Sequence, residues 1–276
     1  MSRIVRVFPR KTKATPEDKL AFTDEPGLFP PECDEVHVSV AFTYDMERAE
    51  QLAEAWSKVA PVKVGGPAFS QPGGEFVPGQ YLKAGYVITS RGCPNHCWFC
   101  AVPKRERNGL HELEVKDGWN ILDDNLLACS EQHIREVFSM LKRQKHKARF
   151  TGGLEAKLLR NWHCELLRDL KPERMYFAYD TPDDYEPLSA ASKLLQSHGL
   201  LRMRGIGVYC LCGYSSDTME KAEARFMQVL RLGMCPYAML WRDKTGKVNT
   251  DWRHFQRLWA APQIIYSRMK ELGLKT

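Results

Sequence analysis

A regular alternation of strand-like and helix-like segments runs through residues 86–241 and limits the chain to few fold classes. Runs typical of strands occur at residues 86–89, 119–122, 149–151, 174–179, 205–211 and 237–241. Amphipathic segments with helical spacing separate the later runs, at residues 131–143, 155–170, 188–197 and 216–232. Strands that alternate with helices pair in parallel through right-handed crossovers. We therefore expect an α/β fold, a partial (β/α)6 TIM-like barrel that is open and curved.

Shorter segments flank this region. Residues 36–40 and 62–64 are typical of strands and enclose a helical pattern at 45–59, so we expect a small N-terminal α/β unit. The residues before about 35 are polar and Pro-rich, with few periodic signals. Residues 251–270 predict C-terminal helices that pack over the barrel. The expected domains are an N-terminal segment (1–80), the barrel (81–245) and a helical extension (246–276).

The hydropathy and the charge of the sequence limit where the protein can be located and what it can bind. No apolar run approaches the roughly 20 residues that span a bilayer, and no apolar signal-peptide region follows the first residues. We expect a cytoplasmic protein that does not bind membranes. The net charge is +6, and basic residues gather at 3–13, 104–107 and 142–149. We interpret these segments mainly as solvated surface, with attraction to phosphate or nucleic acid as the alternative.

Three of the nine cysteines stand close together after the first barrel strand. Cys93, Cys97 and Cys100 have the spacing C-x3-C-x2-C. Disulfides are rare in a reducing cytosol, so such a group indicates metal or redox chemistry. Thiolates are the usual ligands of iron–sulfur clusters, and three of them leave one iron of a four-iron cube open. Zinc is the alternative, but zinc usually takes four Cys or His ligands and no second pair is present.

The loop Arg91-Gly92-Cys93-Pro94-Asn95-His96-Cys97-Trp98-Phe99-Cys100 resembles the signature of the radical S-adenosylmethionine (radical SAM) superfamily. The resemblance covers residues 86–241 and implies that Cys93, Cys97 and Cys100 hold a 4Fe-4S cluster whose open iron binds S-adenosyl-L-methionine. It implies an enzyme that takes an electron from a flavodoxin or ferredoxin and cleaves S-adenosylmethionine reductively. The resulting 5′-deoxyadenosyl radical abstracts hydrogen from a substrate. Phe99, the aromatic residue before the last cysteine, is then expected near the adenine.

The same resemblance assigns cofactor-binding residues to the ends of later strands, where parallel α/β folds bind ligands. Gly152 and Gly153 correspond to a glycine pair that holds the amino group of S-adenosylmethionine, although the acidic residue of that pattern is displaced by one position. Asp180 is expected to contact the ribose or the substrate, or else to cap a turn. Val208 and Leu211 are expected to line the adenine.

Other cysteines and the N-terminal unit leave alternatives open. Cys210, Cys212 and Cys235 could hold an auxiliary cluster or donate a hydrogen atom, but buried structural cysteine is the favoured interpretation. The N-terminal unit looks like a reduced version of the cobalamin domain that some relatives carry. It lacks the Asp-x-His-x-x-Gly segment, and its histidine, His37, lies within a predicted strand. We therefore predict no cobalamin.

The final substrate does not follow from these patterns. Modification of a nucleic acid or nucleotide is one branch, favoured by the basic segments, and a small metabolite or peptide is the other. A function of another class is a non-enzymatic zinc-binding, RNA-interacting module. Metal content distinguishes the two classes, because bound zinc is colourless and an iron–sulfur cluster is brown.

Overall fold

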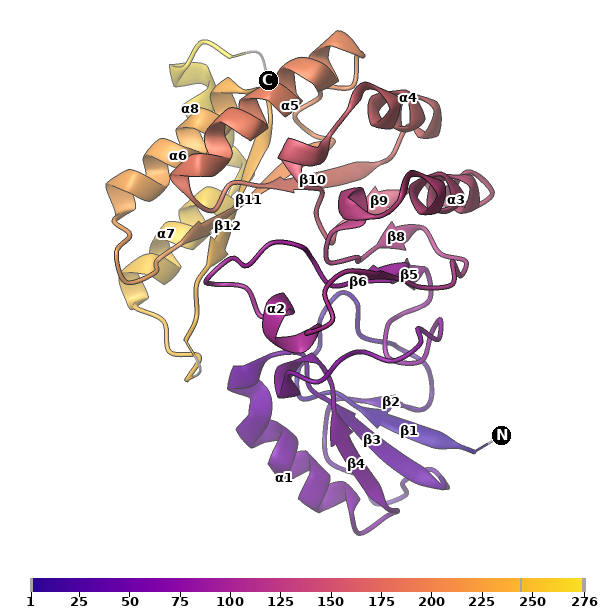
Figure 1. The fold of residues 1–276 in the computed structure, drawn as a ribbon. Helices are drawn as coiled ribbons and strands as arrows, with labels where there is room; N and C mark the ends of the chain where they lie inside the picture. The colour runs from indigo at the N-terminus through magenta and orange to yellow at the C-terminus, as the bar shows by residue number, and fades with distance from the viewer. Residues whose placement is uncertain (1, 244, 275–276) are drawn as a thin grey trace. The chain divides into compact units, whose positions relative to one another are not determined.

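The computed structural model describes residues 2–243 and 245–274 (Figure 1). It divides into two compact units, one of Met1–Gly118 with Asp243–Gly246 and one of Trp119–Arg242 with Lys247–Thr276. Each unit has its own parallel sheet and its own helices. The expectation of an α/β protein is confirmed at this level. The expected domain boundaries after residues 80 and 245 stay predictions.

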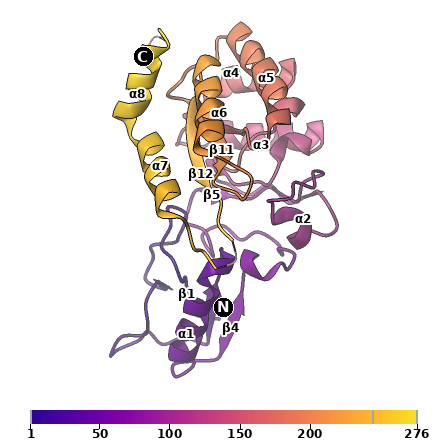
Figure 2. The same cartoon turned by 90° about the vertical axis from the view of Figure 1, so that its left-hand side faces the viewer.

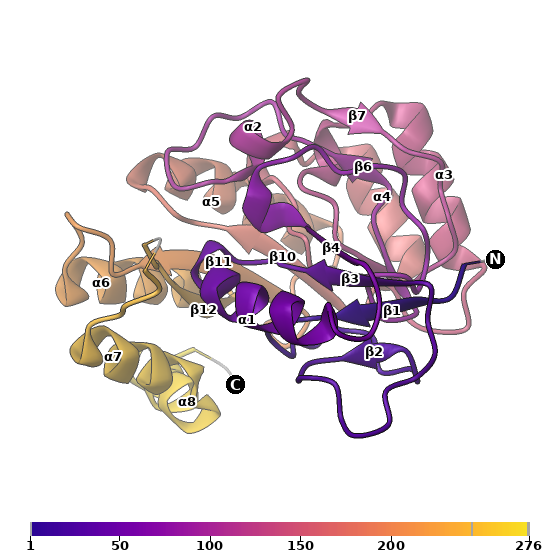
Figure 3. The same ribbon diagram turned by 90° about the horizontal axis from the view of Figure 1, so that it is seen from below.

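The first unit is built on a four-stranded parallel sheet. Its strands run in the order β2-β1-β3-β4. Their bounds are β1 (Ile4–Val7), β2 (Ala21–Phe22), β3 (Glu35–Ser39) and β4 (Val62–Gly65). Helix α1 (Met46–Trp56) packs against β3 and β4 (Figure 3). Buried valines of the sheet form one core with Leu52 and Trp56 of this helix.

Strand β1 lies among the residues before 35, whose sequence contains few periodic signals and for which no strand was predicted. Val5 and Val7 are fully buried and pair in register with Val36 and Val38 of β3. The strand has only four residues, so it gives almost no periodic signal in the sequence. Arg6 lies between the two valines and is only 8% exposed, because its guanidinium donates hydrogen bonds to backbone carbonyl oxygens. The expected strand–helix–strand unit is therefore a four-stranded sheet with one helix.

The rest of the first unit consists of short elements. They are the 3-10 helices Thr43–Asp45 and Pro67–Phe69, the strands β5 (Tyr86–Val87), β6 (Ser90–Arg91) and β7 (His111–Glu112), and the single-turn helix α2 (Val102–Arg105). Strands β6 and β7 pair antiparallel. The segment between them contains the three clustered cysteines.

The second unit alternates strands and helices as expected. Its own strands lie in the order β12-β11-β10-β9-β8, and each pair is parallel. The strands are β8 (Asn120–Ile121), β9 (Arg149–Phe150), β10 (Arg174–Ala178), β11 (Ile206–Cys212) and β12 (Cys235–Leu240). The helices between them are α3 (Glu131–Lys142), α4 (Asn161–Leu170), α5 (Tyr185–Ser197) and α6 (Met219–Arg231). This order places the carboxyl ends of all five strands at one edge of the sheet.

Two helices begin or end differently from the sequence pattern. The helix expected at 155–170 is a 3-10 turn, Ala156–Leu158, followed by α4. The helix expected at 251–270 is two helices, α7 (Thr250–Ala260) and α8 (Pro262–Glu271), with a bend between them (Figure 2). Ala261 is extended with ψ of 117°, because a residue before proline disfavours the helical conformation. Helix α7 lies against β12 as expected for a C-terminal cover.

No helix within residues 2–243 and 245–274 is both long and apolar enough to span a bilayer.

Candidate functional site

The cysteine segment is a loop whose two ends are held together. Arg91 of β6 pairs with His111 of β7 and closes the loop. Just inside this pair, Gly92 has a φ of +85°, and a Cβ atom there would lie 2.1 Å from the carbonyl oxygen of Gly109. A glycine is required at position 92 by both the backbone conformation and the contact. The chain therefore presents residues 93–108 as a closed loop beyond a two-stranded ribbon.

All three cysteines of this loop are at least partly exposed. Cys97 is exposed, whereas Cys93 and Cys100 are half-buried. The Asn95 amide donates to Cys93 Sγ and the Val102 amide donates to Cys100 Sγ, each at 3.5 Å. Backbone N–H donors to sulfur stabilise thiolates and set the potential of iron–sulfur clusters. Two of the three thiols thus already have the outer hydrogen bonds that such ligands use.

The donor set fits an iron–sulfur cluster, although the side chains are not gathered around a centre. Among the residues that the structure describes, no three His, Cys, Asp or Glu side chains are grouped as metal ligands. Metal sites commonly form only as the ligands bind, because the ligand atoms must deprotonate and converge. Three accessible thiols on one loop, with amide donors to two of them, supply the chemistry that an iron–sulfur cluster needs.

Two aromatic residues precede the last cysteine. Trp98 is 59% exposed, and the Phe99 ring meets it edge to face with centroids 5.4 Å apart. Phe99 lies in the first unit with the cysteines, while Gly152, Gly153, Asp180, Val208 and Leu211 lie in the second. The assignment of Phe99 to adenine therefore stays a prediction.

Three of the remaining cysteines, Cys164, Cys210 and Cys212, have no exposed surface. Burial raises the pKa of the Cys164 thiol to about 11 and that of Cys212 to about 12, and it raises the pKa of Cys210 strongly. Such thiols stay protonated at neutral pH and do not act as ligands in this form. They match the interpretation of Cys210 and Cys212 as structural cysteines.

Gly152 follows β9 at the carboxyl edge of the second sheet. A Cβ atom at this position would lie 2.4 Å from the carbonyl oxygen of Asp123 and 2.7 Å from the carbonyl carbon of Leu122. Only glycine allows the chain after β9 to pass this close to the chain after β8. Gly153 has a φ of +105° and open space around its Cα. The glycine pair is thus explained locally by backbone packing, and its role toward a ligand stays a prediction.

Asp180 links the ends of two neighbouring strands. Its Oδ1 atom accepts a hydrogen bond of 2.9 Å from the backbone amide of Leu211 in β11. The turn after β10 is capped instead by Asp184, which accepts from the amides of Asp180 and Thr181. Burial raises the pKa of Asp180 to about 6, although the Leu211 amide opposes this shift. The alternative role of Asp180 as the turn cap is therefore filled by a neighbour.

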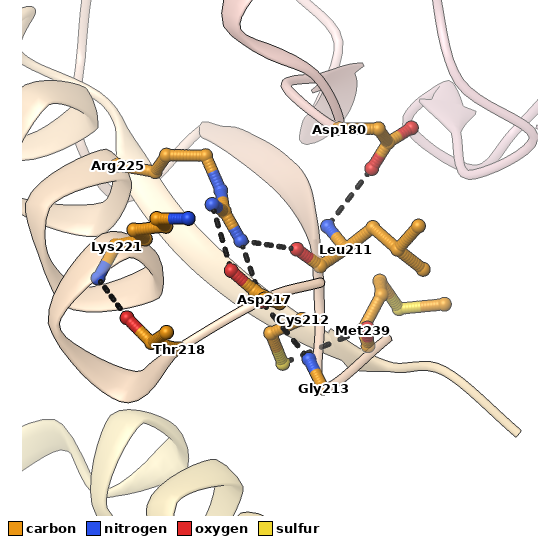
Figure 4. A network of polar contacts seen from close by, with 9 residues as sticks. All are labelled: Asp180, Leu211, Cys212, Gly213, Asp217, Thr218, Lys221, Arg225 and Met239. Carbon is orange, nitrogen blue, oxygen red and sulfur yellow. Dashed lines mark hydrogen bonds and ion pairs between the residues drawn. The ribbon is translucent and has the colours of Figure 1, made fainter. Parts of the chain in front are cut away.

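A buried ion pair holds the same strand end from the other side (Figure 4). Arg225 of α6 donates to the carbonyl oxygen of Leu211 at 2.9 Å and to both carboxylate oxygens of Asp217, at 3.1 and 2.9 Å. Asp217 also accepts from the amide of Gly213 at 3.0 Å. The N–H and the C=O of Leu211 are therefore both held, by Asp180 and by Arg225. We call this arrangement the Leu211 clamp.

The clamp contains residues that sequence reasoning missed. Arg225 is 7% exposed on the face of α6 that also buries Ala222, Phe226 and Val229. A charged residue within an apolar helical stripe is the signal that would have indicated a buried partner. Asp217 gave no such signal, since it precedes the helix in a polar segment.

The two strand residues predicted to line adenine differ in exposure. The Val208 side chain is fully buried in the core, while Leu211 is half-buried near the end of β11. Of the pair, Leu211 has side-chain surface available at the carboxyl edge, where it lies beside Asp180. Val208 supports this edge from within the sheet.

The basic N-terminal segment is structural rather than a free charged tail. Arg6 is buried and forms an ion pair with Asp18. Arg10 binds both carboxylate oxygens of Asp45, at 2.9 and 2.6 Å. These arginines stabilise the first unit, so their number alone does not indicate a nucleic-acid surface.

The side chain of His37 is hydrogen-bonded within the first unit. Its Nδ1 atom lies 2.6 Å from the hydroxyl of Tyr81 and its Nε2 atom lies 2.9 Å from Glu35. Both ring nitrogens therefore have protein partners. The absence of cobalamin stays a prediction.

No protein-family model matches this chain, and no curated protein matches it.

Proposed function

We propose that this chain is a radical SAM enzyme. The observation that carries the proposal is the closed loop with three accessible thiols at C-x3-C-x2-C spacing, two of which accept backbone amides. The proposal assigns Cys93, Cys97 and Cys100 as the ligands of a 4Fe-4S cluster. When bound, this cluster supplies the electron that cleaves S-adenosylmethionine into methionine and a hydrogen-abstracting 5′-deoxyadenosyl radical.

The second unit supplies the nucleotide-binding residues in this proposal. The parallel order of β8 to β12 supports the finer assignment of a partial (β/α)6 barrel. Gly152 and Gly153 offer backbone without side chains to the amino acid portion of S-adenosylmethionine. Leu211 offers a fixed peptide and an apolar side chain to the adenine.

Asp180 fixes the end of β11 through the Leu211 amide, and its carboxyl group is protonated in a fraction of the molecules near pH 6. Its raised pKa of about 6 makes it an ionised acceptor for the Leu211 amide above that pH. Below that pH the protonated carboxyl can donate to a ribose hydroxyl or other acceptor. Asp180 is thus suited to hold the ribose.

A one-electron donor of the flavodoxin or ferredoxin class and a cytoplasmic location complete the proposal. Radical chemistry needs a reductant, and a reduced iron–sulfur cluster needs protection from oxygen. For the substrate, a nucleic acid or nucleotide and a small metabolite or peptide both stay open in this proposal.

Anaerobic reconstitution tests the proposal. The full chain is loaded with iron and sulfide, and iron, visible absorption and 5′-deoxyadenosine are measured with a reductant and S-adenosylmethionine. We expect about four irons per chain and reductant-dependent 5′-deoxyadenosine.

The matched controls use other cysteines. Replacing Cys93, Cys97 and Cys100 together by Ala removes the colour and the product, whereas Cys33→Ala and Cys235→Ala, at two other half-buried thiols, keep both. Persistent colour in the triple variant would place the cluster elsewhere. Colourless protein with one zinc per chain would favour the zinc-binding module instead.

A further inference from the structure

The first unit contains a pocket that none of the residues assigned above lines. Its volume is about 530 Å³, within the range of sites for small molecules. It lies where the chain leaves the carboxyl ends of β1, β3 and β4, since residues just beyond each of these strands line it. Open parallel sheets bind ligands at this edge.

The pocket wall is tied to both ends of the cysteine loop. Arg91, before the first cysteine, donates to the carbonyl oxygen of Gly74 at 3.2 Å. Glu106, after the last cysteine, accepts from the amide of Gly73 at 3.3 Å. Both glycines line the pocket, as do Arg91 and Arg105. A molecule in the pocket therefore lies beside the segment that carries the three thiols.

Two basic side chains on one side of the pocket have acidic partners. Arg10 binds both carboxylate oxygens of Asp45, and Lys63 binds Glu35 at 2.8 Å. These two pairs neutralise one side of the pocket. The charges of Arg10 and Lys63 are therefore already neutralised and do not require a bound anion.

The other side is balanced in the same way. Arg105 donates to Glu106 at 2.9 Å, and Glu75 lines the pocket together with Arg91. Three basic side chains of the pocket, Arg10, Lys63 and Arg105, are thus paired with carboxylates, and Arg91 and Glu75 add one charge of each sign to its lining. An ion would have to break these pairs, so the charge favours an uncharged occupant.

Aromatic side chains supply apolar surface for a ring. Phe8, Phe42 and Phe76 line the pocket. Phe42 is 39% exposed and stacks on Tyr44 with centroids 5.1 Å apart and an interplanar angle of 8°. Aromatic walls prefer planar rings in stacked or edge-to-face contact.

Tyr81 provides a hydrogen-bonding group of defined polarity. Hydrogen bonds from Lys63 and His37 lower the pKa of Glu35, which is therefore an ionised acceptor. With the Nε2–H of His37 donating to Glu35, its Nδ1 atom accepts the Tyr81 hydroxyl. Tyr81 lines the pocket, and with its hydrogen on His37 its oxygen can accept a hydrogen bond from a ligand N–H or O–H.

We infer that this pocket binds an uncharged nucleoside, with its ring among the phenylalanines and an N–H or O–H donor on Tyr81. As a binding site the inference stands on the pocket alone. As the substrate site of the enzyme it rests on the proposed function.

Calorimetric titration of the reconstituted full chain tests the inference. The probes are uridine and guanosine and their 5′-monophosphates, with saturating S-adenosylmethionine and no reductant, so that the cofactor site does not take the probes. We expect at least one nucleoside to bind, and its monophosphate to bind no tighter. No nucleoside binding at millimolar concentration, or a monophosphate at least about tenfold tighter, would overturn the inference.

Two glycines give a matched pair of blocking variants. A Cβ atom at Gly74, in the pocket wall, or at Gly27, outside the pocket, meets nothing within 4 Å. Gly74→Leu should therefore weaken nucleoside binding by about tenfold or more by filling space, while Gly27→Leu leaves it unchanged. Equal binding by Gly74→Leu and wild type would place the ligand elsewhere.

Tyrosine variants test the polar contact. Tyr81→Phe should raise the Kd by about three- to tenfold, the value of one neutral hydrogen bond, and Tyr185→Phe in the second unit should not. An unchanged Kd in Tyr81→Phe would remove Tyr81 from the site.

Iron and 5′-deoxyadenosine are measured on the same samples. Nucleoside binding without 5′-deoxyadenosine would contradict the proposed function only, and the reverse would contradict this site only.

Discussion

At the scale of single residues, Asp180 combines burial with a hydrogen bond that favours its ionised form. Burial is the stronger influence, and the pKa in the folded protein rises from 3.8 to about 6. The folded state therefore binds the proton more tightly than the unfolded state does. Stability from this group is present below the unfolded pKa and is lost as the pH rises through 6.

Asp180→Asn should remove this dependence. Between pH 5 and pH 7 the wild type should lose about 1 kcal/mol of unfolding free energy relative to the variant. Urea unfolding of both proteins at the two pH values measures the difference. Parallel profiles would show that Asp180 titrates as an ordinary carboxyl group.

Residues whose shared role depends on spacing along the chain can be proposed from sequence, although the role itself stays a prediction. Cys93, Cys97 and Cys100 share one loop, so their spacing alone indicated a common role. Arg225 and Asp217 could not be paired in this way, because their contact depends on how α6 packs on β11. The same holds for Tyr81 and His37, which are joined only by the fold.

At the scale of elements, the ribbon of β6 and β7 decides how the cysteine loop is presented. Gly92 and Gly109 both have positive φ, at +85° and +77°, but only Gly92 has a neighbour at its missing Cβ. Alanine at either position costs about 1 kcal/mol in backbone strain. At Gly92 it also clashes with the Gly109 carbonyl and opens the loop.

Gly92→Ala should therefore lower iron retention after reconstitution by at least about half by separating the loop ends, whereas Gly109→Ala retains iron like the wild type. Iron per chain after gel filtration measures the effect. Similar loss in both variants would assign it to backbone strain and not to the loop ends.

The elements themselves were predictable where they were long and periodic. Helix α3 begins at Glu131 as predicted, after the cap Ser130, whereas α6 begins three residues later than predicted, because Thr218 caps it. Strand β1 was missed because its four residues give only two alternations and stand in a polar, Pro-rich segment. The break between α7 and α8 was missed because apolar residues at helical spacing occur on both sides of Pro262.

At the scale of the whole molecule, each unit has its own core. The first is centred on Trp56, which is fully buried, contacts Phe22 at 5.1 Å and donates to the Asp24 carbonyl. In the second unit Phe226 of α6 contacts Phe255 and Trp259 of α7, at 5.7 and 4.9 Å. Separate cores allow separate cooperative units.

Trp56→Ala should destabilise the first unit by about 3–5 kcal/mol through loss of buried surface. Hydrogen exchange followed by mass spectrometry should show faster exchange in β1, β3 and α1, with β10 and β11 unchanged. Equal acceleration in both units would indicate a single cooperative molecule.

Strand order predicted the parallel sheet of the second unit, but nothing in the sequence indicated that β1 stands beside β3.

The Leu211 clamp has a consequence for how this protein can change. Because separate elements bind the N–H and the C=O of Leu211, the position of this peptide group is fixed. A change in ligand preference at this edge must then come from substitution of the surrounding side chains. Moving the peptide itself would leave the buried Arg225 without one of its acceptors.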